Sequence, residues 1–348
     1  MKPATPIIKF ALPAGSLNNP GRGNTSQLLS DAGYNIDGYE PGKESMRPMF
    51  VNDKEIEAFV DRPQNMPVSL SEGVYDLAIL GSDWAREWEL AGIKIGQMTD
   101  LDYGRATIVL AVKSESPVGN IEQLVESSRS TLVRLSTEYL LIAANSVTGT
   151  DAWRAAYGTT AKPLFDTRIM QRRAIIERMA AGLVISESFG KTEVGAINGS
   201  GIDAIVENTQ TGRSLTEAIL KPVGTIFNST ACLYASLSAL GEPAKLEKIG
   251  QVATLLMGVV KGRNSEYVSF NVPEERLQCI VNYLILNQYT AKMPTVSVFG
   301  GNAVVSTVLP KGEYPKAILG LLGIGADDIV NIRTGQIVAR RQYARAGK

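Results

Sequence analysis

Histidine is absent: none of the 348 residues of this sequence is a histidine. The chain therefore cannot contain a Ser-His or Cys-His nucleophile pair, an imidazole general base or a His-ligated zinc site. Its two cysteines, Cys232 and Cys279, each stand alone among apolar residues. We expect buried free thiols in a reducing compartment, and neither a disulfide framework nor a thiolate metal site. Any chemistry must rest on carboxylates, Arg, Lys and backbone groups.

Net charge and long apolar runs are also lacking. The 35 basic side chains balance the 35 acidic ones, so no overall field attracts nucleic acid and ligands must be recognised locally. No apolar run approaches the roughly 18 residues that a membrane span needs. Lys9 interrupts the apolar residues near the start, which argues against a signal peptide. We expect a cytoplasmic protein with no nucleic-acid partner and no membrane partner.

The length and the order of the apolar segments predict an α/β protein of more than one domain. A chain of 348 residues with 44% hydrophobic residues has material for two or three domains. Short apolar runs suited to buried strands alternate with helical patterns, and the ligands of such folds bind at strand ends. The expected strands are residues 7–12, 55–60, 75–80, 106–112, 131–135, 182–186 and 202–206, and residues 148–180 have a helical pattern.

Beyond Pro243 the pattern changes to βαββαβ. The expected elements are a helix at 245–260, a strand at 267–272, a helix at 274–286, strands at 294–299 and 303–309, a helix at 314–322 and a strand at 328–332. This order predicts a ferredoxin-like unit with its own core. Because the unit carries no cluster of catalytic candidates, we assign it to regulation or assembly.

The segment 201–215 predicts a strand, an anion-binding turn and a helix. Residues 211–214, here called the cradle, combine a glycine, a fixed positive charge and the free N–H groups of a helix start, which suits a phosphate. Ser214 and Glu217 have the spacing of a capping box. Glu207 at the strand end could accept two sugar hydroxyls. The alternative is a plain strand-to-helix turn, which also favours Gly and Ser.

Two further places could hold a ligand. Gly21-Arg22-Gly23 lies between the first strand and the next helix, although such clusters are also ordinary loops. Asp83 follows the strand 75–80, at the kind of strand end where α/β ligand sites form, and it is also a plausible N-cap. Both interpretations of each place stay open from the residues alone.

Taken together, these segments resemble the ATP phosphoribosyltransferases, the first enzymes of histidine biosynthesis, in their long form with a carboxyl-terminal regulatory domain. The resemblance covers nearly the whole chain, and the cradle in combination with residues 76–83 is its most specific part. The segments that carry it are 12–15, 62–67, 76–83, 100–105, 136–139, 190–193, 201–215, 229–233, 258–263, 265–267 and 273–277.

The resemblance implies two α/β lobes similar to periplasmic binding proteins, followed by the ferredoxin-like domain. The expected boundaries are residues 1–112 with 216–242 for the first lobe, 113–215 for the second lobe, and 243–340 for the regulatory domain. The resemblance also implies a homo-oligomer, a dimer or a hexamer, and feedback inhibition by histidine.

The resemblance further implies the reaction. In this family ATP attacks phosphoribosyl pyrophosphate through adenine N1, pyrophosphate leaves with Mg²⁺, and phosphoribosyl-ATP forms. Positioning and electrostatics supply most of such catalysis, so a chain without histidine can perform it. By resemblance Glu207 holds the ribose hydroxyls and Glu193 helps with ribose or metal, with weak Mg²⁺ contacts from both. The resemblance implies that phosphoribosyl pyrophosphate binds to Thr211, Gly212, Arg213, Ser214 and Gly15. It implies that pyrophosphate and ATP bind to Arg62, Asp83 and Arg105. The catalytic candidates are Glu207, Glu193 and Arg62.

The sequence departs from the family pattern in the first loop. A lysine usually precedes the glycine there, whereas Ala14-Gly15-Ser16 carries no charge. We expect Arg22 to supply the missing charge, because a guanidinium can bind pyrophosphate bidentately. The alternative is that Arg22 points to water. The missing lysine also keeps open a second class of function, a non-catalytic nucleotide-binding sensor or regulatory paralogue.

Overall fold

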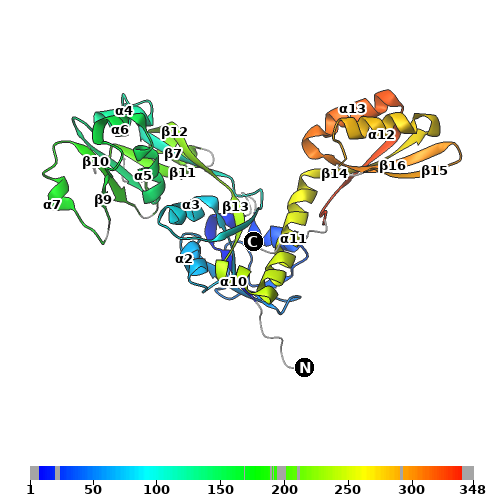
Figure 1. The fold of residues 1–348 in the computed structure, drawn as a ribbon, viewed down its shortest axis with the longest axis horizontal. Helices are drawn as coiled ribbons and strands as arrows, with labels where there is room; N and C mark the ends of the chain where they lie inside the picture. The colour runs from blue at the N-terminus through cyan, green and yellow to red at the C-terminus, as the bar shows by residue number, and fades with distance from the viewer. Residues whose placement is uncertain are drawn as a thin grey trace. The chain divides into compact units, whose positions relative to one another are not determined.

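The computed structural model describes residues 8–19, 24–167, 169–188, 190, 192–193, 201–209, 212–290 and 293–338. The chain divides into two compact units, residues 1–25 with 37–246 and residues 26–36 with 247–348. Figure 1 labels their helices and strands.

The first lobe of the larger unit contains a seven-stranded sheet. Its strands are β1 (Ile8–Pro13), β2 (Ile36–Asp37), β3 (Met49–Phe50), β4 (Ile56–Asp61), β5 (Leu77–Gly81), β6 (Gly96–Asp100) and β13 (Ala231–Ala235), and its helices are α2 (Met66–Ser71), α3 (Ser82–Leu90) and α10 (Leu237–Gly241). The strand order is β2-β3-β4-β1-β5-β13-β6. Because β4, β1 and β5 are parallel, their carboxyl ends lie at one edge of the sheet.

The second lobe contains a six-stranded sheet. Its strands are β7 (Ala106–Lys113), β8 (Leu132–Thr137), β9 (Leu164–Asp166), β10 (Gly182–Glu187), β11 (Ala204–Thr209) and β12 (Leu220–Ser229), and its helices are α4 (Ile121–Ser127), α5 (Leu140–Thr148), α6 (Asp151–Tyr157), α7 (Arg173–Ile176) and α9 (Arg213–Glu217). The order is β12-β7-β11-β8-β10-β9, with β11, β8, β10 and β9 parallel. The cradle therefore follows a central strand of this sheet.

The chain crosses between the lobes twice. Residues 101–105 lead from β6 to β7, and Thr230 alone separates β12 from β13. The two-lobed α/β fold is as predicted, but β7 and β12 pair with each other in the second sheet, whereas we expected 106–112 and 220–229 in the first lobe. The two strands lie more than 100 positions apart in the chain, so no local pattern in the sequence indicated their pairing.

Residues 148–180 do not form the helical region that we expected. Instead α5 ends at Thr148, α6 covers 151–157 and β9 follows, and among the described residues from there to 180 only the short α7 is helical. Gly158 adopts a left-handed φ of 83° directly after α6, and Pro163 stands before β9. A left-handed glycine ends a helix and a proline does not continue one, which explains the break.

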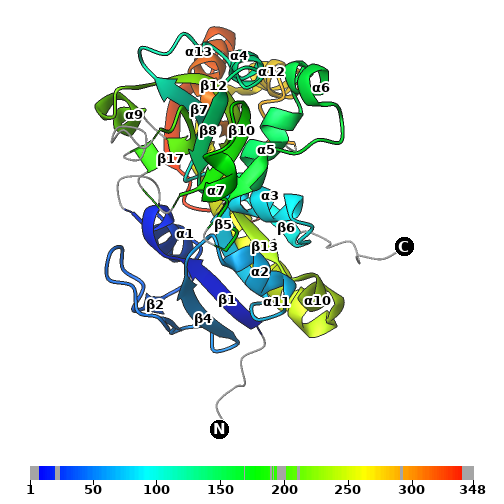
Figure 2. The ribbon, with the colours of Figure 1, turned by 90° about the vertical axis from the view of Figure 1, so that its left-hand side faces the viewer.

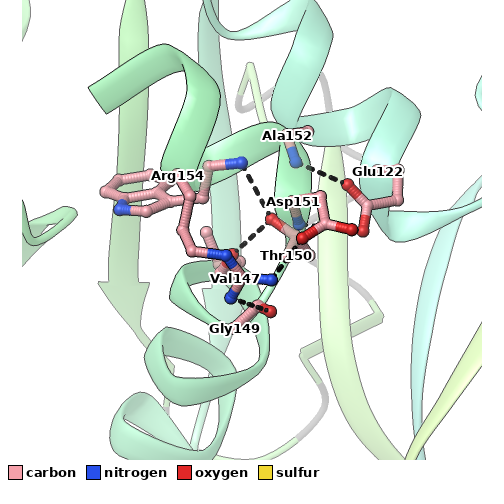
Figure 3. A network of polar contacts seen from close by, with 8 residues as sticks. Glu122, Val147, Gly149, Thr150, Asp151, Ala152 and Arg154 are labelled. Atoms are coloured by element: carbon pink, nitrogen blue, oxygen red, sulfur yellow. Dashed lines mark hydrogen bonds and ion pairs between the residues drawn. The ribbon is translucent and has the colours of Figure 1, made fainter. Parts of the chain in front are cut away.

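Two side chains hold the start of α6 (Figure 3). Thr150 is its N-cap and accepts the N–H of Trp153 at 3.0 Å. Glu122 of α4 accepts the N–H groups of Asp151 and Ala152 at 3.2 and 2.8 Å. A carboxylate at a helix start satisfies orphan donors and interacts favourably with the helix dipole. These bonds tie α4 to α6 within the second lobe.

The smaller unit is the ferredoxin-like domain that the sequence predicted. Its elements after α11 (Pro243–Arg263) are β14 (Ser265–Pro273), α12 (Leu277–Leu286), β15 (Thr295–Phe299), β16 (Asn302–Pro310), α13 (Tyr314–Ile324) and β17 (Asp327–Arg333). The sheet is antiparallel in the order β15-β16-β14-β17 over a core that includes Phe270 and Leu284. Most of α1 (Thr25–Asp31) clusters with this unit, where Arg263 binds Asp31 at 2.8 Å.

The two cysteines lie in different surroundings. Both thiols are free, but Cys232 is buried on β13 whereas Cys279 is exposed on α12. The prediction was wrong for Cys279, because the buried face of α12 is formed by Ile280, Val281 and Leu284. Among the helices in the described ranges, none is both long and apolar enough to cross a membrane.

Candidate functional site

Residues 212–214 of the cradle follow β11 and include the start of α9. β11 ends at Thr209 and α9 begins at Arg213, in the predicted order of strand, turn and helix. Gly212 is the N-cap of α9 with a left-handed φ of 71°, and its N–H donates to Thr209 Oγ1 at 2.9 Å. A Cβ added to Gly212 would meet no atom within 4 Å. The space in front of this backbone is therefore open to a ligand, whereas Thr211 lies outside the described residues.

The predicted capping box is wrong. Gly212 caps the helix in place of Ser214, and Glu217 accepts a bond from Arg213 Nε at 2.7 Å. The Arg213 side chain is 83% exposed, so its ion pair with Glu217 is worth little in water. An anion at the cradle can therefore compete for the Arg213 guanidinium.

Glu207 lies on β11, half-buried, two residues before the end of the strand. Its Oε1 accepts the N–H of Asn208 at 3.0 Å. Burial raises the pKa of the Glu207 carboxyl, hydrogen bonds from Thr192 and Asn208 offset part of this rise, and the negative charges of Glu193 and Glu138 add to it. A carboxylate in such surroundings gains from a ligand that brings hydroxyl donors or positive charge.

Glu193 and Glu138 stand near Glu207 on neighbouring segments. Glu138 directly follows β8 and accepts the N–H of Gly190, and Thr192 shares a 2.8 Å hydroxyl contact with Ser188. Acidic side chains thus gather at the carboxyl ends of β8, β10 and β11. Within the part of the chain that the structure describes, no group of three or more His, Cys, Asp or Glu could hold a metal ion.

The first-lobe candidates do not all share one place. Gly15 has a φ of 82° in the loop after β1, and Arg62 is exposed directly after β4, so both lie at the carboxyl edge of the first sheet. Arg105 lies instead in the crossing segment 101–105, where its exposed guanidinium binds Asp102. Arg22 is outside the described residues.

Asp83 is not the N-cap that its position suggested. Gly81 is the N-cap of α3, and Asp83 is in the first helical turn with only 4% of its surface exposed. Its Oδ1 accepts the hydroxyl of Ser229 at 2.8 Å, and its Oδ2 accepts the hydroxyl of Tyr139 at 2.7 Å. Both carboxylate oxygens thus bond to second-lobe groups, which makes Asp83 a contact between the lobes, and its expected part in ATP binding stays a prediction.

A cavity of about 540 Å³ lies between the lobes. Trp84 and Trp88 of α3 line it from the first lobe, and Phe165 at β9 lines it from the second. Its remaining lining residues are Gln64, Asn65, Glu87, Ala91, Glu138, Leu140, Leu141, Thr167, Met170, Glu187 and Ser188. The volume lies in the range of ligand pockets, and aromatic walls with a few polar groups suit a planar base.

Sequence analysis missed the residues that shape this cavity. Trp84 and Trp88 are four apart on α3, a spacing that puts both on one face of a helix and could have been noticed. Tyr139 and Phe165 carry no such local signal, because their contacts depend on how the two sheets meet. Tyr139 is buried and packs on Trp84 with ring centroids 4.7 Å apart.

Comparisons with known proteins point to one family. A family model described as ATP phosphoribosyltransferase matches residues 62–258, more than half of the chain. An ATP phosphoribosyltransferase of Desulforudis audaxviator is 28% identical over 339 residues, covering 95% of this chain and 99% of that protein. One from Pelotomaculum thermopropionicum is 27% identical over 338 residues with the same coverage. The solved structure of an ATP phosphoribosyl transferase (HisG:HisZ) complex from Thermotoga maritima has a chain that matches 73% of this chain and 98% of its own length at 20% identity, with a TM-score of 0.50 that supports the fold.

Proposed function

We propose that this chain, which belongs to the ATP phosphoribosyltransferase family, joins N1 of ATP to the ribose of phosphoribosyl pyrophosphate in the cleft between its two lobes. The observation that supports the location is the open, left-handed backbone at Gly212 after β11, with Glu207 on that same strand. The activity belongs to the first step of histidine biosynthesis, and the sensor alternative is not favoured by the family match.

The second lobe holds the phosphoribosyl group. The free N–H groups at the start of α9, together with Arg213, receive the 5-phosphate, and Glu207 accepts the ribose hydroxyls. The ribosyl carbon passes through an oxocarbenium-like state as pyrophosphate departs, and a nearby carboxylate stabilises the positive charge that develops there. Glu207 thus contributes both position and charge.

Mg²⁺, when bound, supplies charge neutralisation for the departing pyrophosphate. Glu193 and Glu207 would hold it on the protein side, because their negative charges repel each other and a cation would relieve that repulsion. Two carboxylates do not complete the coordination of this ion, so the substrate's phosphate oxygens would provide further ligands. Arg62, exposed at the end of β4, would face the same phosphates from the first lobe.

The aromatic cavity would take the adenine of ATP. Trp84, Trp88 and Phe165 offer flat apolar surfaces, and stacking on an aromatic ring stabilises a bound base by about 1–3 kcal/mol. The chain contains three tryptophans, and the third, Trp153, is buried in the core of the second lobe. Intrinsic fluorescence therefore reports largely on the cavity.

Adding ATP to the protein is expected to change tryptophan emission saturably. The change should persist when Trp153 is replaced by phenylalanine, and it should shrink strongly in Trp88→Phe. Inorganic triphosphate is the control ligand, because it lacks both the base and the ribose. If the emission change on adding ATP is lost in Trp153→Phe and unaffected in Trp88→Phe, the adenine binds elsewhere.

The ferredoxin-like unit would carry the histidine response, within a homo-oligomer that is a dimer or a hexamer. Its sheet and core are independent of the cleft residues, and it holds none of the catalytic candidates. Free histidine is expected to protect backbone amides of the full chain within residues 265–333 in hydrogen exchange. The exchange rates of the cleft segments 62–88 and 132–209 should stay unchanged shortly after histidine is added. Protection confined to those segments would show instead that histidine competes at the active site.

A further inference from the structure

Helix α3 of the first lobe carries two buried carboxylates on one face. Asp83 and Glu87 are four residues apart, and 4% and 8% of their respective surfaces are exposed. Buried carboxylates are costly unless hydrogen bonds satisfy them. The bonds that do so here come largely from the second lobe, whose helix α5 lies next to α3 in both ribbon views (Figures 1 and 2).

Both carboxylates bind one short segment, residues 139–142, at the junction of β8 and α5. Tyr139 donates its hydroxyl to Asp83 Oδ2 at 2.7 Å. Glu87 accepts the N–H of Leu141 at 2.7 Å and the N–H of Ile142 at 2.8 Å. These are free donors in the first turn of α5, where a negative charge also meets the positive end of the helix dipole. The first lobe thus caps a helix of the second.

The same junction touches the ribose site. Asn208 Nδ2 lies 3.4 Å from the Tyr139 hydroxyl and donates to it, and the N–H of Asn208 donates to Glu207 Oε1 at 3.0 Å. A chain of polar contacts therefore runs from α3 through Tyr139 and Asn208 to Glu207. Ser229, at the end of β12 in the second lobe, also donates its hydroxyl to Asp83, where this series of contacts reaches the first lobe.

We propose that Asp83 and Glu87 form an interlobe latch that positions Glu207 and the bound ribose relative to the cavity wall on α3, acting through residues 139–142. They are positioning residues: Asp83 is buried, and Glu87, which also lines the cavity, has both carboxylate oxygens bonded to the N–H groups of Leu141 and Ile142. Trp84 lies between them on α3 and lines the cavity assigned to adenine. The latch therefore fixes the position of this cavity wall relative to Glu207, the carboxylate assigned to the ribose. This inference rests on the function proposed above.

The second lobe contains a matched pair of contacts that do not cross between lobes. Glu122 accepts two N–H groups at the start of α6, as Glu87 does at the start of α5 (Figure 3). Tyr157 donates its hydroxyl to the carbonyl oxygen of Ser128 at 2.9 Å. Glu122→Gln therefore alters the same kind of bond within one lobe and is the control for Glu87→Gln. Tyr157→Phe removes a tyrosine hydroxyl bond within one lobe, there to a neutral carbonyl, and is the control for Tyr139→Phe.

Steady-state kinetics of the full chain with both substrates test the latch. All four variants are expected to lose some thermal stability, but only Glu87→Gln and Tyr139→Phe should lower kcat, by about tenfold or more, as expected for a charge-assisted bond. The KM for phosphoribosyl pyrophosphate should stay within about threefold, because the cradle belongs wholly to the second lobe. Asp83→Asn combined with Tyr139→Phe should lower kcat less than the product of the two single effects, since both changes act on the bond between these two side chains.

A second readout needs no turnover. Phosphoribosyl pyrophosphate binding at the cradle should alter the emission of Trp84 through Tyr139, in the wild type and in Glu122→Gln, and Tyr139→Phe should lose this response. If the latch variants keep wild-type kcat and emission, or if the control variants lose as much kcat, the latch is wrong. A wild type that forms no product overturns the proposed function alone, because the emission response still decides the latch.

Discussion

Replacing Gly212 by valine is expected to reduce kcat/KM for phosphoribosyl pyrophosphate by at least about a hundredfold. Gly212 has a φ of 71°, a conformation that costs a non-glycine residue about 1–2 kcal/mol and a β-branched one more. Its Cβ position is open space, so the new side chain would project into the volume assigned to the 5-phosphate. Strain and steric exclusion therefore act together. Isothermal titration of phosphoribosyl pyrophosphate separates lost binding from lost chemistry.

Gly224→Val is the matched control for this substitution. Gly224 is an exposed glycine of β12 in the same lobe, its added Cβ also meets nothing within 4 Å, and its φ is not left-handed. Valine suits a strand, so the control should fold and bind normally. Equal binding losses in the two variants would show that the effect at Gly212 is not specific to the cradle.

Glu207→Gln is expected to lower turnover by about ten- to a hundredfold, because it removes a charge-assisted bond worth about 1.5–3 kcal/mol. The same substitution should not destabilise the fold. Burial raises the pKa of Glu207, so the folded chain binds this proton more tightly than the unfolded chain does. The free energy of unfolding then falls as pH rises from the ordinary glutamate pKa through the raised one, and it stays lower above both.

Glutamine has no such proton to lose. The variant should therefore match or exceed the wild-type free energy of unfolding near neutral pH, with the difference shrinking as pH falls toward about 4. Urea unfolding at several pH values measures this, and Glu115→Gln, at an exposed position of the same lobe, controls for the lost charge. Full turnover in a folded Glu207→Gln variant would remove Glu207 from the site.

The local parts of the structure were predictable and the contacts between sheets were not. The order of strand, turn and helix at 204–217 follows from apolar runs, a glycine and polar turn residues that act on near neighbours. The βαββαβ order after Pro243 follows from the spacing of hydrophobic residues, which has one period in strands and another in helices and can be read within each single element. The cap of α9 was mistaken because the helix begins earlier than expected, after a left-handed Gly212 with no side-chain cap bond, and Glu217 bonds to Arg213 instead of completing a capping box.

Asp83 illustrates what sequence could not supply. Its place after β5 suggested a ligand or a cap, but its two oxygens are taken by Ser229, 146 positions later, and Tyr139, 56 positions later. Such partners depend on the path of the chain through residues 101–105 and Thr230, which no local pattern encodes. The aromatic cavity is hidden for the same reason, since its walls come from α3 and from the far edge of the second sheet.

The central claim is that a bond forms between adenine N1 and the ribose within this chain's cleft. The direct measurement supplies the full-length protein with Mg²⁺, ATP isotopically labelled at adenine N1, and phosphoribosyl pyrophosphate labelled at the anomeric carbon, and records magnetic resonance spectra of the products. Our account predicts a one-bond coupling between the two labels, one pyrophosphate released per adduct, and neither signal from Gly212→Val. Pyrophosphate release without that coupling, or binding of both substrates with no product, would contradict it.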